Sequence, residues 1–125
     1  PLLNLSGAKA RFEYASQLIG RDLLAICRGE SDSKIIPNDI NDTRNTQPAL
    51  FVIESLLVDD LKKQGRKASF AAGHSLGELV ALYAADVFDL NNALKLLKKR
   101  SELMAEAAEG ACVMFWSNSG RCTER

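Results

Sequence analysis

A serine between two glycines is the feature of this sequence best suited to chemistry. Gly73-His74-Ser75-Leu76-Gly77 matches the pattern G-x-S-x-G, in which a serine occupies a tight turn between a strand and a helix. Glycines two positions either side allow this strained turn, which exposes the hydroxyl. We therefore expect a nucleophile elbow at residues 73–77, with Ser75 as nucleophile and the Leu76 N–H as an oxyanion donor. The alternative is a turn whose serine only caps the next helix.

His74 is the only histidine in the chain, and it is adjacent to Ser75. Adjacent residues on such a turn point in different directions, so we do not expect His74 to act as the general base for Ser75. Because the sequence holds no second histidine, we expect little or no turnover from this chain alone.

Arg100 is the second candidate for a functional role, because its helical neighbours are apolar. The residues three and four positions away are Leu96, Leu97, Leu103 and Met104. A guanidinium in such surroundings is costly unless it meets an anion. That anion is either a carboxylate of the chain, such as Glu54 or Glu78, or the carboxylate of a substrate held bidentately. The spacing leaves both alternatives open.

Glu54 lies among apolar residues of a predicted helix. Leu50, Phe51, Leu57 and Val58 occupy its helical neighbour positions. We expect a satisfied structural carboxylate here rather than part of a site.

The elements expected around these residues alternate between helix and strand. Helices are predicted for residues 7–19, 23–28, 46–64, 76–85 and 90–108. A buried strand is predicted for residues 68–72, and a further strand for residues 111–116. Ser6, Thr46 and Asp89 are the expected helix caps, and residues 29–45 are expected to form a loop. The arrangement predicts an α/β fold, part of an α/β-hydrolase-like parallel sheet covered by helices.

Composition excludes several classes of protein. The 125 residues suffice for one domain, and 46% hydrophobic and 26% charged residues are typical of a folded globular chain. Sixteen basic and sixteen acidic residues give no electrostatic case for nucleic acid or an anionic membrane, and no apolar run approaches the length of a membrane span. Cys27, Cys112 and Cys122 have no metal-binding spacing, so we expect reduced thiols and no metal.

Three stretches resemble the bacterial-type malonyl-CoA:acyl-carrier-protein transacylases. They are GHSLGE at residues 73–78, TQPAL at residues 46–50, and KKRSELM, which contains Arg100 at 25 positions after Ser75. The similarity covers most of residues 5–111. It implies that Ser75 carries the acyl group, that Arg100 binds the free carboxylate of a malonyl group, and that Gly73, His74 and Gly77 build the elbow.

The resemblance also implies the reaction and its partners. A malonyl group would pass from CoA to acyl carrier protein through a Ser75 acyl-enzyme in fatty acid biosynthesis, with malonyl-CoA as substrate and no cofactor. We expect a monomer when full length, located in the cytoplasm or, in a eukaryote, in a plastid. The alternatives are a polyketide-synthase-type acyltransferase domain, an α/β-hydrolase esterase, and a non-catalytic module that binds acyl groups or carrier protein.

The family's first strand, its glutamine-bearing glycine turn and its downstream catalytic histidine have no counterpart in these residues. We therefore expect residues 1–110 to form part of the large acyltransferase subdomain, an N-terminal fragment. Residues 111–125 diverge from the family, as a truncation, a change of reading frame or a true variant tail would. With few strands to pair, the chain is expected to be marginally stable or prone to aggregate.

Overall fold

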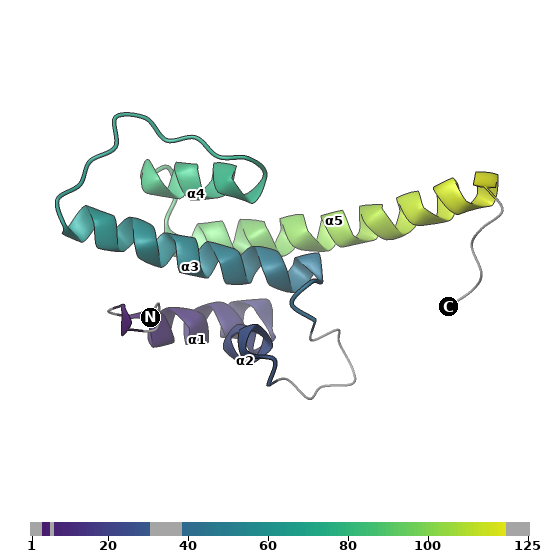
Figure 1. Cartoon of the computed structure of the whole chain (residues 1–125), viewed down its shortest axis with the longest axis horizontal. Coiled ribbons are helices and arrows are strands. Elements are labelled where there is room, and N and C mark those ends of the chain that lie inside the picture. Colours follow the sequence, from purple (N-terminus) through teal and green to yellow (C-terminus); the bar gives the residue numbers. More distant parts are fainter. Residues whose placement is uncertain (1–3, 6, 31–38, 120–125) are drawn as a thin grey trace.

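Five helices make up the regular structure of the described part of the chain. The structure, a computed structural model, describes residues 4–5, 7–30 and 39–119, with side chains up to Glu109. The helices are α1 (Ala8–Ile19), α2 (Leu23–Arg28), α3 (Thr43–Lys63), α4 (Leu76–Ala84) and α5 (Leu90–Ser119) (Figure 1).

Helix α3 is the centre of the arrangement, and each of the other four helices packs against it. In Figure 1 it lies between α1 and α4, with α5 alongside and extending well beyond the other helices. Phe51 and Val52 of α3 and Leu94 and Leu97 of α5 are completely buried where the two helices meet. The core therefore forms around α3, which also carries one end of the site described below.

The predicted parallel sheet is wrong for this structure. No strand occurs among residues 4–5, 7–30 and 39–119. Residues 68–72, expected as a buried strand, form an extended exposed segment in which Phe70 is 95% exposed. A strand needs a neighbour to accept and donate its backbone hydrogen bonds, and none lies alongside this segment in the described structure.

The second predicted strand, residues 111–116, is helical. Helix α5 continues through Gly110 to Ser119. A short apolar run fits a strand or a buried helix equally well by periodicity. Adding a residue to an existing helix avoids the cost of nucleation, so the preceding helix decides the conformation.

Helix α3 begins at Thr43, three residues before the expected start, with Asp42 rather than Thr46 as its cap. Pro48 consequently lies inside the helix and cannot donate to the carbonyl four residues earlier. That carbonyl, of Arg44, accepts a hydrogen bond of 2.7 Å from the Arg21 guanidinium instead. The helix therefore passes through the proline because a side chain from another segment replaces the missing donor.

The remaining boundaries agree closely with expectation. Asp89 caps α5 as predicted, since its carboxylate accepts from the Asn92 N–H at 2.7 Å. Gly20 ends α1 in a left-handed conformation with φ of 83°, which glycine adopts without steric cost. The N-cap of α1 is Gly7, while the expected cap Ser6 lies outside the described residues.

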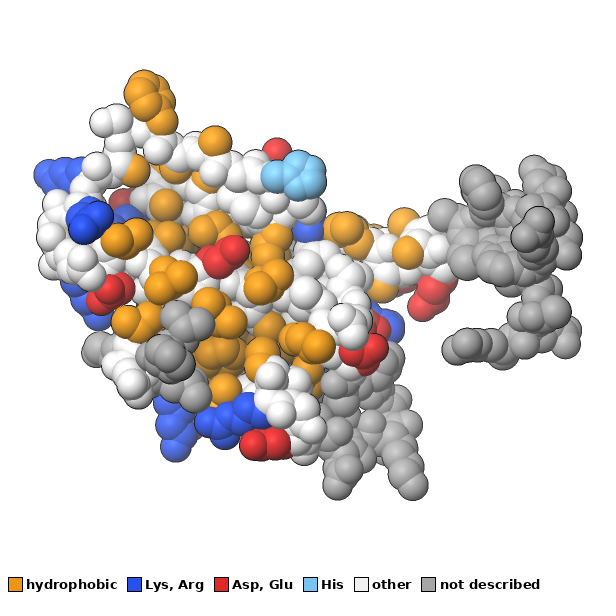
Figure 2. Space-filling model, viewed as in Figure 1, with side chains coloured by type: hydrophobic (Ala, Val, Ile, Leu, Met, Phe, Trp, Pro, Cys, Tyr) orange, Lys and Arg blue, Asp and Glu red, His pale blue; other side chains and the backbone are white. Residues whose placement is uncertain are grey.

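Much apolar surface remains uncovered on the described residues. Figure 2 shows hydrophobic side chains gathered over the middle of one face. Leu50, Leu57 and Leu61 of α3 are each more than 40% exposed. None of the described helices combines the length and apolarity needed to cross a membrane. The expected marginal stability of the isolated chain stays a prediction.

Leu97→Ala should lower the free energy of unfolding by about 2–5 kcal/mol, because it leaves a cavity at a completely buried position of α5. Leu96→Ala changes the preceding residue, which is 46% exposed, and should cost only about 0.5 kcal/mol. Urea denaturation followed by circular dichroism compares the two. Equal losses would contradict the packing of α5 against α3.

Candidate active site

The backbone at Ser75 has the strained conformation of a nucleophile elbow. Ser75 has φ of 56° and ψ of −113°, a region that residues with side chains rarely occupy. It is the residue before α4, but its side chain makes no capping hydrogen bond to that helix. The interpretation of Ser75 as a mere helix cap is therefore wrong. The exposed hydroxyl is available for other contacts.

Of the two glycines that flank Ser75, only Gly73 lies where a side chain would clash with the backbone. A Cβ placed on Gly73 would lie 2.0 Å from the carbonyl carbon and oxygen of Gly77, far inside van der Waals contact. A Cβ on Gly77 would meet nothing within 4 Å among the described atoms. The expected steric reason for glycine holds at Gly73, where the chain passes close to the start of α4, and not at Gly77.

The Arg100 guanidinium joins the elbow to the start of α3. Its Nη2 donates to Ser75 Oγ at 3.0 Å, and its Nη1 donates to Gln47 Oε1. The two candidates that the sequence singled out 25 positions apart therefore lie in direct contact. This contact depends on α5 packing against α3 and on the elbow lying at the start of α4.

The charge of Arg100 is not matched by a carboxylate in the described structure. None of the ion pairs among residues 4–5, 7–30 and 39–109 includes Arg100, so neither Glu54 nor Glu78 is its partner. Both groups that it contacts, an amide oxygen and a hydroxyl, are neutral. Of the two alternatives left open by the sequence, the internal ion pair is therefore excluded for the described residues.

Gln47 is the site residue that sequence reasoning missed. It was expected only as part of a helix entry, yet it is buried, with 6% of its surface exposed. A polar side chain directly before Pro48 and the apolar run of α3 was the available signal, because a buried amide must find hydrogen-bond partners.

The two residues beside Ser75 lie as the elbow pattern predicts. Leu76 begins α4, so its N–H has no acceptor within that helix. His74 is exposed, and no hydrogen bond joins its ring to Ser75 Oγ among the described contacts. Its carbonyl accepts from the Gly77 N–H at 2.9 Å, which closes the turn. The roles of Leu76 as oxyanion donor and of His74 as a non-catalytic neighbour stay predictions.

A polar network fixes α4, and with it the elbow, on the rest of the structure. The Tyr83 hydroxyl of α4 donates to the Asp59 carboxylate of α3 at 3.0 Å. The Arg11 guanidinium of α1 pairs with the same carboxylate. The Tyr83 ring also packs edge-on against Phe51, with centroids 5.7 Å apart. Three helices thus meet at Asp59.

A cavity of about 390 Å³ lies between α3, α4 and residues 71–72, beside the elbow. Glu54 is the one charged residue on its wall, and Gly77 forms part of the opposite side. Glu54 Oε2 is buried without a hydrogen-bond partner among the described residues, so the expected satisfied carboxylate is wrong for this oxygen. Burial raises the pKa of the Glu54 carboxyl above its ordinary value of 4.5.

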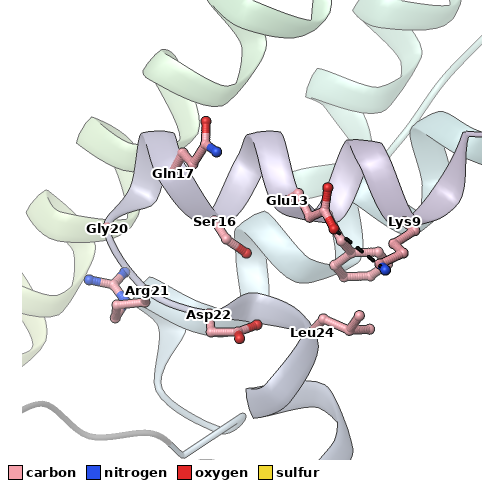
Figure 3. A pocket seen from close by; sticks show the side chains of 9 residues that line it. Lys9, Glu13, Ser16, Gln17, Gly20, Arg21, Asp22 and Leu24 are labelled. Atoms are coloured by element: carbon pink, nitrogen blue, oxygen red, sulfur yellow. Dashed lines mark ion pairs between the residues drawn. The ribbon is translucent and has the colours of Figure 1, made fainter.

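A second cavity, of about 540 Å³, lies between α1 and α2 and away from Ser75 (Figure 3). Two of its polar groups hold the start of α2 in place. Ser16 Oγ accepts from the Leu23 N–H at 3.0 Å, and Asp22 caps α2 through the Ala25 N–H at 3.0 Å. We therefore assign it to the packing of α2 on α1.

No group of three or more acidic, histidine or cysteine residues suited to a metal ion occurs among the described residues. Cys27 is a free, exposed thiol. Cys112 and Cys122 lie outside the described side chains. The site consequently consists of a hydroxyl, a guanidinium, an amide and the backbone of the elbow.

Comparison with known proteins identifies relatives along most of the chain. The family model described as the acyl transferase domain matches residues 14–117. The malonyl CoA-acyl carrier protein transacylase of Synechocystis sp. is 43% identical over 109 residues, which are 87% of this chain and 35% of the relative. The crystal structure of the Synechocystis malonyl-CoA:ACP transacylase superposes with a TM-score of 0.72 at 42% identity, covering 85% of this chain and 34% of that one.

A polyketide biosynthesis malonyl CoA-acyl carrier protein transacylase of Bacillus subtilis is 36% identical over 99 residues, 78% of this chain and 33% of the relative. The chain thus spans about a third of the length of these relatives.

Gly73→Ala should lower the free energy of unfolding by at least about 2 kcal/mol, because the added methyl group forces the elbow backbone apart. Gly77→Ala places the same methyl group in open space within a helix and should raise stability by about 0.5–1 kcal/mol. Urea denaturation measures both. A Gly73→Ala variant as stable as the wild type would show that the close approach at the elbow does not exist.

Glu54→Gln should stabilise the chain at pH 7 and lose that advantage near pH 4. The raised pKa means that the folded state binds a proton which the unfolded state has released, so wild-type stability falls as the pH rises from 4.5 through the folded pKa. Melting temperatures across this range check the expectation. Glu106→Gln, at an exposed position of α5, is the control and should leave the pH profile unchanged. A Glu54→Gln profile parallel to the wild type would contradict the burial of this carboxyl.

Proposed function

Since the chain belongs to the acyl transferase domain family, we propose that it is part of a transacylase that moves a malonyl group from CoA to acyl carrier protein. Ser75 is the proposed acyl carrier of the enzyme, and Arg100 the proposed binding group for the free malonyl carboxylate. The Synechocystis transacylase, whose name describes this reaction, supports the proposal by its sequence and its crystal structure.

The proposed chemistry is a double displacement. Ser75 Oγ attacks the thioester carbonyl of malonyl-CoA, its proton passes to a general base, and the oxyanion is held in part by the Leu76 N–H. The carbon–sulfur bond then breaks, and CoA leaves as the protonated thiol. In the second half, the phosphopantetheine thiol of acyl carrier protein attacks the malonyl-Ser75 ester and frees the serine. No cofactor enters this scheme.

The contact between Arg100 and Ser75 is the observation that carries the proposal. A malonyl group has its carboxylate two carbons from the carbonyl that Ser75 attacks, so the anion and the acyl carbon must be bound close together. A guanidinium 3.0 Å from the nucleophile, without an ion-pair partner among the described residues, meets this requirement. An acyl group without a carboxylate would leave the cation unpaired, which disfavours it.

The general base is not among the residues in contact with Ser75. His74, the only histidine of the sequence, makes no described hydrogen bond to the hydroxyl. We therefore keep the proposal that these 125 residues supply the nucleophile and the carboxylate site, and that they give little turnover by themselves.

A second candidate function is acyl transfer in polyketide biosynthesis. It is favoured by the 36% identity to the Bacillus subtilis polyketide transacylase, whose name describes the same transfer. The Synechocystis transacylase is 43% identical over a longer stretch, and its name specifies the transfer but neither pathway. Fatty acid synthesis stays the first of the two proposals. We also retain a cytoplasmic, monomeric enzyme as part of the proposal.

The chain should bind malonyl-CoA at least about tenfold more tightly than acetyl-CoA, since a hydrogen-bonded carboxylate contributes about 1.5–3 kcal/mol. Arg100→Ala should reduce the ratio of the two affinities to about one, and Arg100→Lys should give an intermediate ratio because lysine cannot bind a carboxylate in the same forked geometry. Isothermal titration calorimetry measures the affinities.

Lys99→Ala is the matched control, because Lys99 is an exposed cation on the preceding position of α5. The ratio of malonyl-CoA affinity to acetyl-CoA affinity in Lys99→Ala should equal that of the wild type. A wild-type chain that does not distinguish the two thioesters, or a preference that survives in Arg100→Ala, would contradict the proposed function.

A further inference from the structure

The amide of Gln47 has a complete and directional set of partners. Its Oε1 accepts from Arg100 Nη1, while its Nε2 donates to Thr43 Oγ1 at 2.6 Å and lies 3.3 Å from Met104 Sδ. The side chain is buried, so water does not compete freely for these positions. Gln47 therefore connects Arg100 of α5 to the first turn of α3.

The direction of the amide follows from the chemistry of its neighbours. A guanidinium has only donors, so an amide that faces it with NH₂ would place donor against donor. With Oε1 facing Arg100, the two N–H groups need acceptors on the other side. Thr43 Oγ1 supplies one and the weakly accepting sulfur of Met104 a second. In the orientation that Arg100 requires, Thr43 Oγ1 accepts from the amide and holds it in place.

The absence of charge on the Gln47 amide matters as much as its orientation. A carboxylate in place of the amide would hold the guanidinium equally well but would also neutralise it, and a substrate carboxylate would then have to compete. The amide fixes Nη1 and leaves the positive charge without a partner among the described carboxylates. Nη2, on Ser75 Oγ, remains on the side of the nucleophile.

We propose that Gln47, held in place by Thr43, is a positioning residue that fixes the Arg100 guanidinium beside Ser75 while leaving its charge available to the acyl carboxylate. The inference rests on the proposed function, because it concerns the same carboxylate. It adds that selectivity for a charged acyl group depends on two neutral residues of α3, neither of which needs to touch the substrate.

The experiment compares Thr43→Val, Thr43→Ser, Gln47→Glu and the wild type by calorimetric titration of the 125-residue chain with malonyl-CoA and acetyl-CoA. Thr43→Val should weaken malonyl-CoA binding about three- to tenfold, the usual effect of one lost hydrogen bond, and leave acetyl-CoA binding unchanged. Thr43→Ser keeps the hydroxyl and should restore the wild-type ratio. Gln47→Glu should remove the preference for malonyl-CoA while preserving or raising the melting temperature, since it adds an ion pair with Arg100.

Thr46→Val is the matched control, because Thr46 lies in the same first turn and its hydroxyl donates to the Asp42 carbonyl at 3.0 Å rather than to the amide. It should alter stability at most, and not the ratio of affinities. Nitrogen-15 spectra of the free chain provide a readout without substrate, in which the Arg100 side-chain signals should broaden or shift in Thr43→Val but not in Thr46→Val.

A wild-type preference for malonyl-CoA that persists in both Thr43→Val and Gln47→Glu would overturn the inference and leave the proposed function standing. The inference also fails if Thr46→Val changes the ratio as much as Thr43→Val does, because the effect would then be a general one of the helix start. A wild type without any preference would contradict the proposed function and the inference together.

Discussion

The unmatched positive charge of Arg100 is the constraint on which the site depends. The guanidinium is held by two neutral oxygens, one from Gln47 and one from Ser75, and by no carboxylate of the described chain. A cation held in this way is poised to gain an anionic partner, and the nucleophile lies 3.0 Å from it. The packing of α5 and α4 against α3 brings the two groups together.

The strain at the elbow and the packing of the helices serve the same arrangement. Ser75 keeps its positive φ because Gly73 allows the chain to pass against the start of α4. Helix α4 is held in turn by Tyr83, through its hydrogen bond to Asp59 and its contact with Phe51. The conformational cost at one residue is thus offset by contacts spread over several helices, as is common at functional sites.

The sequence singled out two residues that the structure brings into contact, but it also predicted a sheet that the described residues do not form. The G-x-S-x-G pattern is a local signal, and Ser75 has the strained backbone before a helix that the pattern predicts. The apolar neighbours of Arg100 drew attention to that residue, but Leu96, Leu103 and Met104 are each more than 40% exposed, so the expected apolar surroundings are wrong for three of the four. Gln47 was not predicted as a site residue, because its contact is with Arg100, 53 positions away, and local sequence patterns do not indicate such distant contacts. A strand is a property of pairs of segments, so composition at residues 68–72 could not decide whether a partner would lie beside them.

The start of α3 is a second place where a contact between distant residues changes what the local sequence predicts. Proline is common in the first turn of a helix, so Pro48 predicts a helix that begins at about Thr46. The helix instead begins at Thr43 and includes Pro48 in its second turn. The Arg21 guanidinium satisfies the carbonyl that the proline leaves free, and the helix begins earlier. Long-range hydrogen bonds of this kind override local propensity and are visible only once the chain is folded.

A crystal structure of the chain with bound malonate would show whether the Arg100 guanidinium binds a carboxylate, because the anion binds where a cation without an ion-pair partner can accept it. We expect a malonate carboxylate on the Arg100 guanidinium next to Ser75 Oγ, with the Gln47 contact to Nη1 retained. Arg100 paired instead with Glu54 or Glu78, or malonate bound elsewhere while this guanidinium stays on Gln47 and Ser75 alone, would contradict it.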